Sequence, residues 1–265
     1  MLEMKHACKT FQAGSVNEHV ALDDMNLTLK DGEFVTVIGS NGAGKSTLFN
    51  AICGTFWLDS GSILLNGEDI SYLPEHKRAL RVGRVFQDPM KGTAPGMTIE
   101  ENLALAHSRT TKGPLSFAPS RKEKEMFREA LAEFDMGLEN RMKTRVGLLS
   151  GGQRQVVTLL MCTLVPPQLL LLDEHTAALD PATANKVMEI TKTIVERHKL
   201  TTLMITHNMS AALSTGDRTI MMDAGKVIFD FQGEERAQMT LDQLLQMYSA
   251  KKQQVFDHDR MLMTP

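Results

Sequence analysis

The chain has 265 residues, enough for one large domain with a subdomain, and its 29 basic and 32 acidic residues leave a formal net charge of −3. No overall basic field therefore favours nucleic acid as a partner, and three widely separated cysteines outside any CxxC pair favour buried thiols over disulfides or a zinc site. Neither a run of 18 apolar residues nor a signal-peptide-like stretch occurs, so we expect no membrane span and no export, and any link to a membrane must come through a partner.

The first third of the chain predicts a small sheet followed by strand and helix. Phe34–Ile38 is a short apolar run that stops at glycine, as a buried strand does, and the Asn66-Gly67 pair is a strong signal for a tight hairpin. The pattern predicts strands over 2–8, 22–30, 34–38, 62–70 and 82–86, and a helix over 45–53.

From about 88 to 165 the pattern is mostly helical. Thr98–Glu101, Ser120–Glu123 and Ser150–Gln153 each have the spacing of a capping box, which starts a helix. Residues 109–119 are expected to be an exposed connection between the first two helices, and Pro166-Pro167 ends the third.

Strands and helices alternate again in the last third, where Asp180-Pro181 reads as a cap followed by proline at the first helical position. The expected elements cover 168–173, 182–198, 200–206, 208–214 and 217–222. Alternation of this kind predicts an α/β fold with a mostly parallel sheet, into which the helical block 88–165 is inserted. We expect one domain over 1–250 and a C-terminal tail over 251–265.

A phosphate-binding motif stands between the predicted strand 34–38 and the helix that follows it. Its glycines let successive N–H groups surround an anion, Lys45 can reach the outer phosphates, and the Ser46 hydroxyl can bind Mg²⁺. A chance glycine-rich turn is the alternative, which the position between strand and helix disfavours. The motif comprises Gly39, Ser40, Asn41, Gly42, Ala43, Gly44, Lys45 and Ser46, followed by Thr47.

Two carboxylates follow the four-leucine run Leu169–Leu172, at the end of a strand where parallel sheets keep their sites. Asp173 can hold Mg²⁺, while Glu174 can polarise a water for attack on a γ-phosphate. Alone, this pattern could equally be a strand that meets a polar loop; together with the phosphate-binding motif it indicates a nucleoside triphosphatase.

The stretch Leu149-Ser150-Gly151-Gly152-Gln153 resembles the signature sequence of ATP-binding cassette (ABC) ATPases. By physics alone it is a capping serine with two glycines at a helix start, a second place for an anion. An ordinary helix cap explains Ser150 and Gln153 but leaves the double glycine unexplained. The resemblance, which spans about residues 1 to 230, implies a P-loop NTPase with a RecA-like sheet, an N-terminal antiparallel β subdomain and an inserted α-helical subdomain.

Further positions resemble the family in order along the chain. The resemblance implies that Gln87 contacts Mg²⁺ and the attacking water, that His207 contacts the γ-phosphate, and that Asp180, in Ala178-Leu179-Asp180, lies in a loop that crosses between subunits. It also places Phe11 where an aromatic ring stacks on adenine. A structural histidine and a core phenylalanine are the alternatives for His207 and Phe11.

His175 departs from the family, which commonly has proline after the catalytic glutamate (DEHTAALD in this chain). We favour a solvated loop residue; the alternative is a histidine that touches the catalytic water or the opposing subunit.

The family resemblance implies a head-to-tail homodimer that sandwiches two ATP molecules with Mg²⁺, each covered by Ser150–Gln153 of the other copy. We expect the peripheral ATPase of an importer for a small solute, on the cytoplasmic face of the membrane, with permease subunits and an extracytoplasmic substrate-binding protein and no nucleic acid. The permease is expected to dock near Gln87–Met97, close to Met90, Met97 and Met126.

Other uses of a cassette fit less well. A soluble ABC ATPase acting on DNA or ribosomes would need a long coiled coil or a second cassette, and neither is present. A cassette without turnover would not retain Lys45, Asp173, Glu174 and His207.

Overall fold

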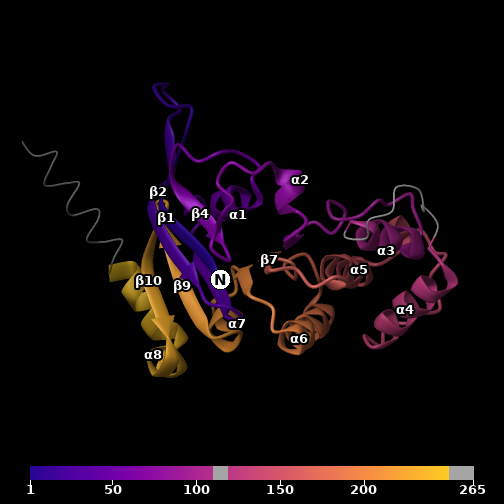
Figure 1. Ribbon diagram of the computed structural model, residues 1–265. Coiled ribbons are helices and arrows are strands. Elements are labelled where there is room, and N and C mark those ends of the chain that lie inside the picture. Colours follow the sequence, from indigo (N-terminus) through magenta and orange to yellow (C-terminus); the bar gives the residue numbers. More distant parts are fainter. Residues whose placement is uncertain (110–118, 251–265) are drawn as a thin grey trace, which may run out of the picture.

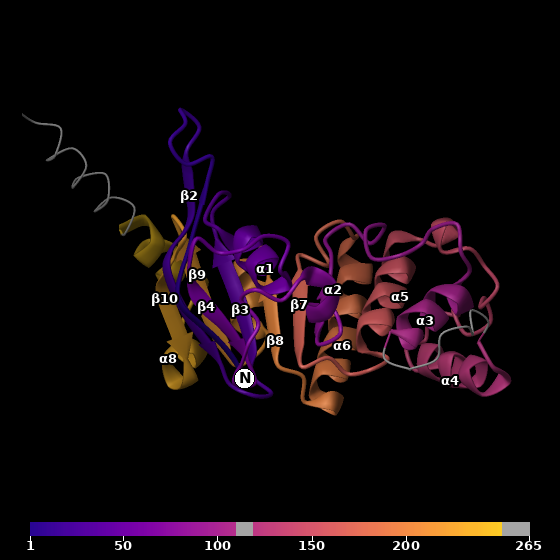
Figure 2. The same cartoon turned by 45° about the horizontal axis from the view of Figure 1, so that its top comes forward.

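A computed structural model describes residues 1–109 and 119–250. Two sheets occupy one side of the molecule, and α3, α4 and α5 gather at the side away from β2 and β10 (Figures 1 and 2). Most of the predicted connection 109–119, and the predicted tail 251–265, lie outside the described residues.

The N-terminal sheet is antiparallel, as predicted, and has the strand order β2-β1-β4-β5. Asn66 and Gly67 have φ of 52° and 79°, so both central residues of the hairpin turn are left-handed, as a type I′ turn requires. Strand β1 (Leu2–Phe11) ends three residues after the predicted 2–8. Strand β2 (His19–Leu29) starts three residues before the predicted 22–30 and ends one residue earlier, and the predicted 62–70 is the hairpin of β4 (Ser60–Leu65) and β5 (Glu68–Asp69).

The second sheet has the order β10-β9-β3-β8-β7-β6, with β10 antiparallel to β9 and the other neighbours parallel. The mostly parallel sheet confirms the predicted fold class, but the edge strand β10 and the helices after it were not predicted. The strands are β3 (Phe34–Gly39), β6 (Val82–Val85), β7 (Leu169–Asp173), β8 (Thr202–Ile205), β9 (Arg218–Asp223) and β10 (Lys226–Gln232).

Helix starts follow the local signals. Thr98, Ser120 and Ser150 each cap a helix in a reciprocal capping box, and Asp180 caps α6 ahead of Pro181. The helices are α1 (Lys45–Cys53), α2 (Glu75–Arg78), α3 (Ile99–Ser108), α4 (Arg121–Ala132), α5 (Gly151–Thr163), α6 (Pro181–His198), α7 (Met209–Ser214) and α8 (Gly233–Gln238), with a short 3₁₀ turn (Val146–Leu148) and helical residues 241–250.

The strand β7 separates two hydrophobic cores. Leu169 and Leu171 pack into the core around α1, whereas Leu170 and Leu172 pack into the core that α5 and α6 cover on the other face. Because successive side chains of a strand point to opposite faces, a strand buried on both faces has to be apolar at every position. The Asp173-Glu174 pair therefore starts where this double burial ends.

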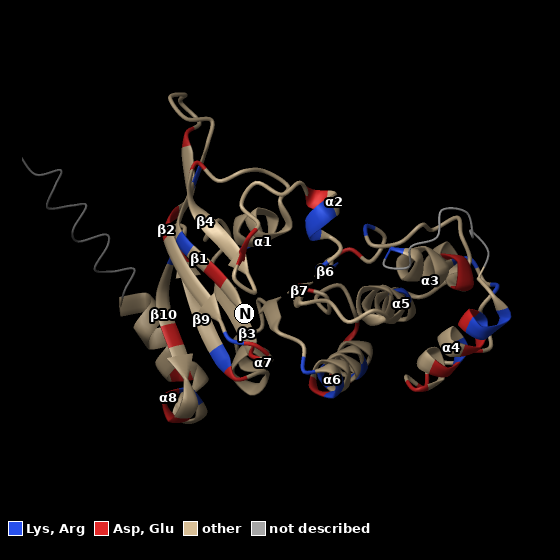
Figure 3. Cartoon of the chain, viewed as in Figure 1, with Lys and Arg blue, Asp and Glu red and all other residues tan. Residues whose placement is uncertain are grey.

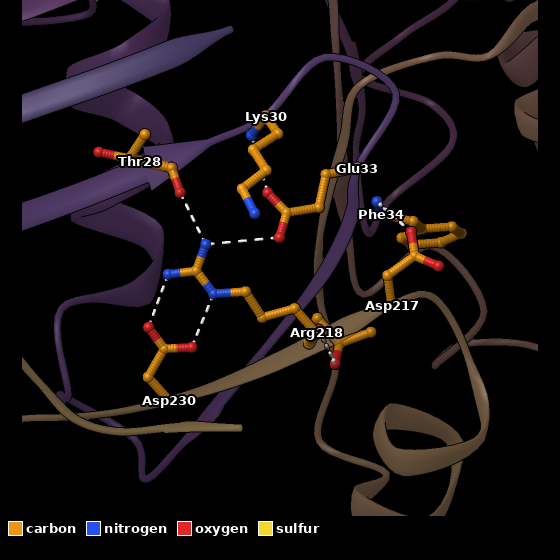
Figure 4. Close-up of polar contacts among 8 residues, drawn as sticks. Thr28, Lys30, Glu33, Phe34, Asp217, Arg218 and Asp230 are labelled. Carbon is orange, nitrogen blue, oxygen red and sulfur yellow. Dashed lines mark hydrogen bonds and ion pairs between the residues drawn. The ribbon is translucent and has the colours of Figure 1, made fainter. Parts of the chain in front are cut away.

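Arg218 joins the two sheets at their shared edge (Figure 4). Its guanidinium donates two hydrogen bonds of 2.6 Å to Asp230 on β10 and one of 2.7 Å to the Thr28 carbonyl on β2. Glu33 lies 3.5 Å away. Hydrogen bonding to Asp230 raises the pKa of Arg218, so the guanidinium stays charged. Its charged hydrogen bonds hold the N-terminal sheet against β9 and β10.

Candidate active site

A cavity of about 390 Å³ opens where the phosphate-binding motif meets the end of β7. Loop, helix and strand ends all contribute to its wall, as expected at the carboxyl edge of a parallel sheet. The lining residues are His19, Asn41, Gly42, Ala43, Gly44, Lys45, Ser46, Thr47, Gln87, Glu174 and His207.

The loop that bounds this cavity can be formed only with glycine at two of its positions. Gly44 has φ of 96° and leads into α1, and a Cβ there would lie 2.4 Å from the Ala21 carbonyl oxygen. At Gly39 a Cβ would lie 2.3 Å from the Met222 carbonyl oxygen. The loop therefore packs closely against β9 and β2. Its N–H groups and the start of α1 are then available to bind an anion.

Lys45 is buried at the base of the loop, with 6% of its surface exposed. Its ammonium donates hydrogen bonds of 2.8 Å to the carbonyl oxygens of Gly39 and Ser40. Burial lowers its pKa, while the charges of Glu174 and Asp173 act to raise it. The cation is thus held by neutral oxygens that a phosphate can replace.

Glu174 has a left-handed backbone, with φ of 47°, which is uncommon for a residue other than glycine. Its N–H donates to the Ile205 carbonyl, and its side chain is 11% exposed. Gln87 donates to one carboxylate oxygen at 3.1 Å, and His207 Nε2 lies 2.5 Å from the other. The structure therefore brings together the three side chains for which the sequence predicted a catalytic role.

Asp173, the last residue of β7, does not line this cavity and pairs with Arg84 instead. Its Oδ2 accepts a hydrogen bond of 2.7 Å from Arg84, and both side chains are 15% exposed. Ser46 and Gln87 line the cavity. With Asp173 they supply hydroxyl, amide and carboxylate oxygens, the donors that Mg²⁺ takes alongside phosphate oxygens, so the residues present fit this ion.

Comparison with known proteins identifies the family. A family model described as "ABC transporter" matches residues 22–177, more than half of the chain. The chain belongs to the ABC transporter family.

A tyrosine transport ATP-binding protein of Clostridioides difficile is 43% identical, over 94% of this chain and 98% of that protein. A methionine import ATP-binding protein of Corynebacterium glutamicum is 37% identical over 86% of this chain and 61% of its own length. The ATP-binding cassette MJ0796, solved as a dimer in a post-hydrolysis state with ADP and Pi, superposes with a TM-score of 0.76 at 28% identity, over 88% of this chain and 98% of that one. The chain is accordingly an ATP-binding, ATP-hydrolysing cassette of an ABC transporter.

The residues that resemble the ABC signature stand apart from this cavity within one copy. Ser150 caps α5 through Gln153, and Asp180 caps α6 through Thr183, whose hydrogen bonds lower the pKa of Asp180. None of them lines the cavity. Packing explains the second glycine of the pair, which the sequence alone did not: a Cβ at Gly152 would lie 2.1 Å from the Thr183 methyl group.

Phe11, expected at the adenine, does not line the cavity either. Its ring is 36% exposed and meets Phe56 edge-on at 5.3 Å between centroids. His19, which pairs with Phe11 across β1 and β2, lines the cavity and was not predicted. Only the cross-strand register reveals it, because no local signal marks this histidine.

Both interpretations of His175 were wrong. The side chain is 2% exposed, so it is neither solvated nor available to the catalytic water or a second subunit. Its Nε2 lies 3.1 Å from the Thr191 hydroxyl, which donates to the Val187 carbonyl in α6. Burial lowers the pKa of His175 to about 4. A neutral imidazole that donates to Thr191 therefore anchors the residue next to Glu174.

Among residues 1–109 and 119–250, no helix has both the length and the apolar character needed to cross a membrane.

Proposed function

We propose that this chain, as one of a pair, hydrolyses MgATP to power the import of a small solute through a separate permease. The observation that carries the hydrolytic role is the Glu174 carboxylate, held between Gln87 and His207 at the mouth of the phosphate-binding cavity.

The phosphates of ATP are bound by the loop Gly39–Ser46 and the start of α1. Lys45 exchanges the Gly39 and Ser40 carbonyls for the outer phosphate oxygens, which relieves the cost of its burial. Ser46, Asp173 and Gln87 would hold Mg²⁺, which supplies positive charge to the phosphate oxygens when bound.

The catalytic water is oriented by Glu174. The carboxylate accepts a proton from the water as it attacks the γ-phosphate, while Gln87 and His207 fix its two oxygens. The left-handed backbone at Glu174 aims the side chain at the cavity although the adjacent Asp173 points towards Arg84. Neighbouring carboxylates thereby serve the metal and the water separately.

A second copy completes each site. Ser150, Gly151 and Asp180 are exposed at helix starts and do not line the cavity of their own chain, so they are free to cover ATP on a partner. Helix starts favour anions, which suits the γ-phosphate. In this assembly the Phe11 ring, still 36% exposed, is available to the adenine.

The permease is proposed to dock on a groove next to the helices α3 and α5. A cavity of about 350 Å³ lies between α2, α3, α5 and β6, with Leu105, Met161 and Lys91 among its lining residues. Met90 is 40% exposed beside it and Met97 is partly buried, whereas Met126 packs into the helical core and is withdrawn from the proposal. The α2 rim carries both acidic and basic residues (Figure 3).

The proposed solute class is taken from the names of related proteins. Proteins named for tyrosine transport and methionine import are 43% and 37% identical, so we propose an amino acid, delivered by an extracytoplasmic substrate-binding protein. The chain then sits on the cytoplasmic face of the membrane.

Crosslinking tests this function. Met90→Cys, treated with a thiol crosslinker in native membrane vesicles, is expected to join a membrane protein with a yield that changes with ATP. Glu234→Cys is the matched control, because Glu234 is exposed on α8, which lies beside β10 on the side away from α3 (Figure 1). It is expected to give no such product. Fractionation of the whole protein with cytosol, ribosomes or DNA, without a membrane crosslink, would refute the transport role.

A further inference from the structure

Arg84 connects the docking groove with the metal-binding end of β7. Its Nη2 donates to Asp173 Oδ2 at 2.7 Å, and its Nη1 donates to Asn50 Oδ1 at 2.7 Å. The same side chain lines the 350 Å³ groove. One guanidinium therefore joins β6, β7 and α1, the helix that starts at the phosphate-binding loop.

The surroundings of Arg84 hold the guanidinium in place. Its plane lies over Phe86, with 4.8 Å to the ring centroid, and Phe49 is 5.9 Å away. Its Nε is buried and finds no hydrogen-bond partner among the described residues. Cys53, at the end of α1, lines the same groove. Burial raises the pKa of its thiol, and the charge of Arg84 opposes that rise.

We infer that Arg84 is a positioning residue. It holds the Asp173 carboxylate in the orientation in which it binds Mg²⁺, and it makes the position of that carboxylate depend on what occupies the groove. The pair leaves Asp173 Oδ1 for Mg²⁺ or its water, and outer partners of a ligating carboxylate commonly decide how well it binds. An acceptor oxygen placed in the groove can bind the free Nε and draw the guanidinium away from Asp173. The link to a docked permease rests on the proposed function.

Nucleotide affinity in the presence and absence of metal separates this role from a structural one. Calorimetric titration of the whole isolated protein with a non-hydrolysable ATP analogue is done once with MgCl₂ and once with EDTA. Arg84→Met is expected to weaken binding about tenfold in Mg²⁺ and to leave binding in EDTA unchanged, because Asp173 acts on the nucleotide through the ion. Arg84→Lys, which keeps the charge, is expected to recover part of the loss.

Arg81→Met is the matched control. Arg81 is a nearby arginine whose ion pair with Glu68 lies on the surface, so neither titration is expected to change. Equal loss with and without Mg²⁺ in Arg84→Met would show that the arginine only supports the fold, and no loss would show that Asp173 needs no partner. Either result overturns the inference.

A carboxylate placed inside the groove tests whether the position of Asp173 depends on what the groove contains. Cys53→Asp sets a second carboxylate beside Arg84, and is expected to weaken the Mg²⁺-dependent binding about tenfold, while Cys53→Ala, which offers no acceptor oxygen, has little effect. In the R84M background the aspartate is expected to add nothing. An equal effect of C53D in both backgrounds would refute the link. These titrations need no permease, so a failed membrane crosslink would remove the transport role and leave their outcome intact.

Discussion

Replacing His175 by glutamine is expected to change how stability depends on pH. Burial lowers the pKa of His175 from 6.5 to about 4, so the unfolded chain takes up a proton at a pH where the native chain does not. Stability contributed by the neutral imidazole is complete above pH 6.5 and is lost as the pH falls towards 4. Across this window of about 2.5 units the loss is about 3 kcal/mol, at about 1.4 kcal/mol per unit.

Glutamine is the appropriate replacement because its amide can donate to Thr191, as Nε2 does, and does not titrate. The assay is urea unfolding of both proteins at a series of pH values between about 7 and 4.5. The wild type is expected to lose about 2–3 kcal/mol more than the variant over this range. Identical pH dependence in the two proteins would mean that His175 is not buried as a neutral side chain.

Two further changes address the site itself. His175→Pro sets the residue that the family commonly has after the catalytic glutamate, so kcat is expected to stay near the wild-type value although the contact with Thr191 is lost; a drop of tenfold or more, about 1.4 kcal/mol in the barrier, would show that the buried imidazole is needed to hold Glu174 in place. In mixed dimers, Lys45→Ala on one chain and Ser150→Arg on the other are expected to leave one intact site, whereas both changes on one chain spoil two; equal ATPase rates in the two arrangements would contradict the head-to-tail assembly.

Local signals made most of the fold predictable from sequence. The capping boxes at Thr98, Ser120 and Ser150 and the Asn66-Gly67 turn act through neighbouring backbone atoms, so a short stretch of sequence contains all the interacting groups. The edge strand β10 was missed because the turn that joins it to β9 puts Ala224, with φ of 45°, where glycine or asparagine usually gives the signal.

The misjudged parts of the site depend on contacts between distant residues. His175 is buried because Thr191, sixteen positions later, offers it an acceptor inside α6. The pairing of Arg84 with Asp173 exists because β6 and β7 are neighbours in the sheet although 89 residues separate the two side chains. Neither contact leaves a local pattern, whereas the residues that bind phosphate follow one another along the chain.

The proposed function requires two copies of the chain to enclose ATP and Glu174 to drive its hydrolysis. Glu174→Gln keeps the shape of the side chain but removes the base. The molar mass of this variant in solution, measured by light scattering with MgATP and again after ATP is removed, tests both requirements. The variant is expected to form a stable ATP-bound dimer without turnover and to return to monomer when ATP is removed. A variant that stays monomeric with ATP, or that hydrolyses ATP at the wild-type rate, would contradict the proposed function.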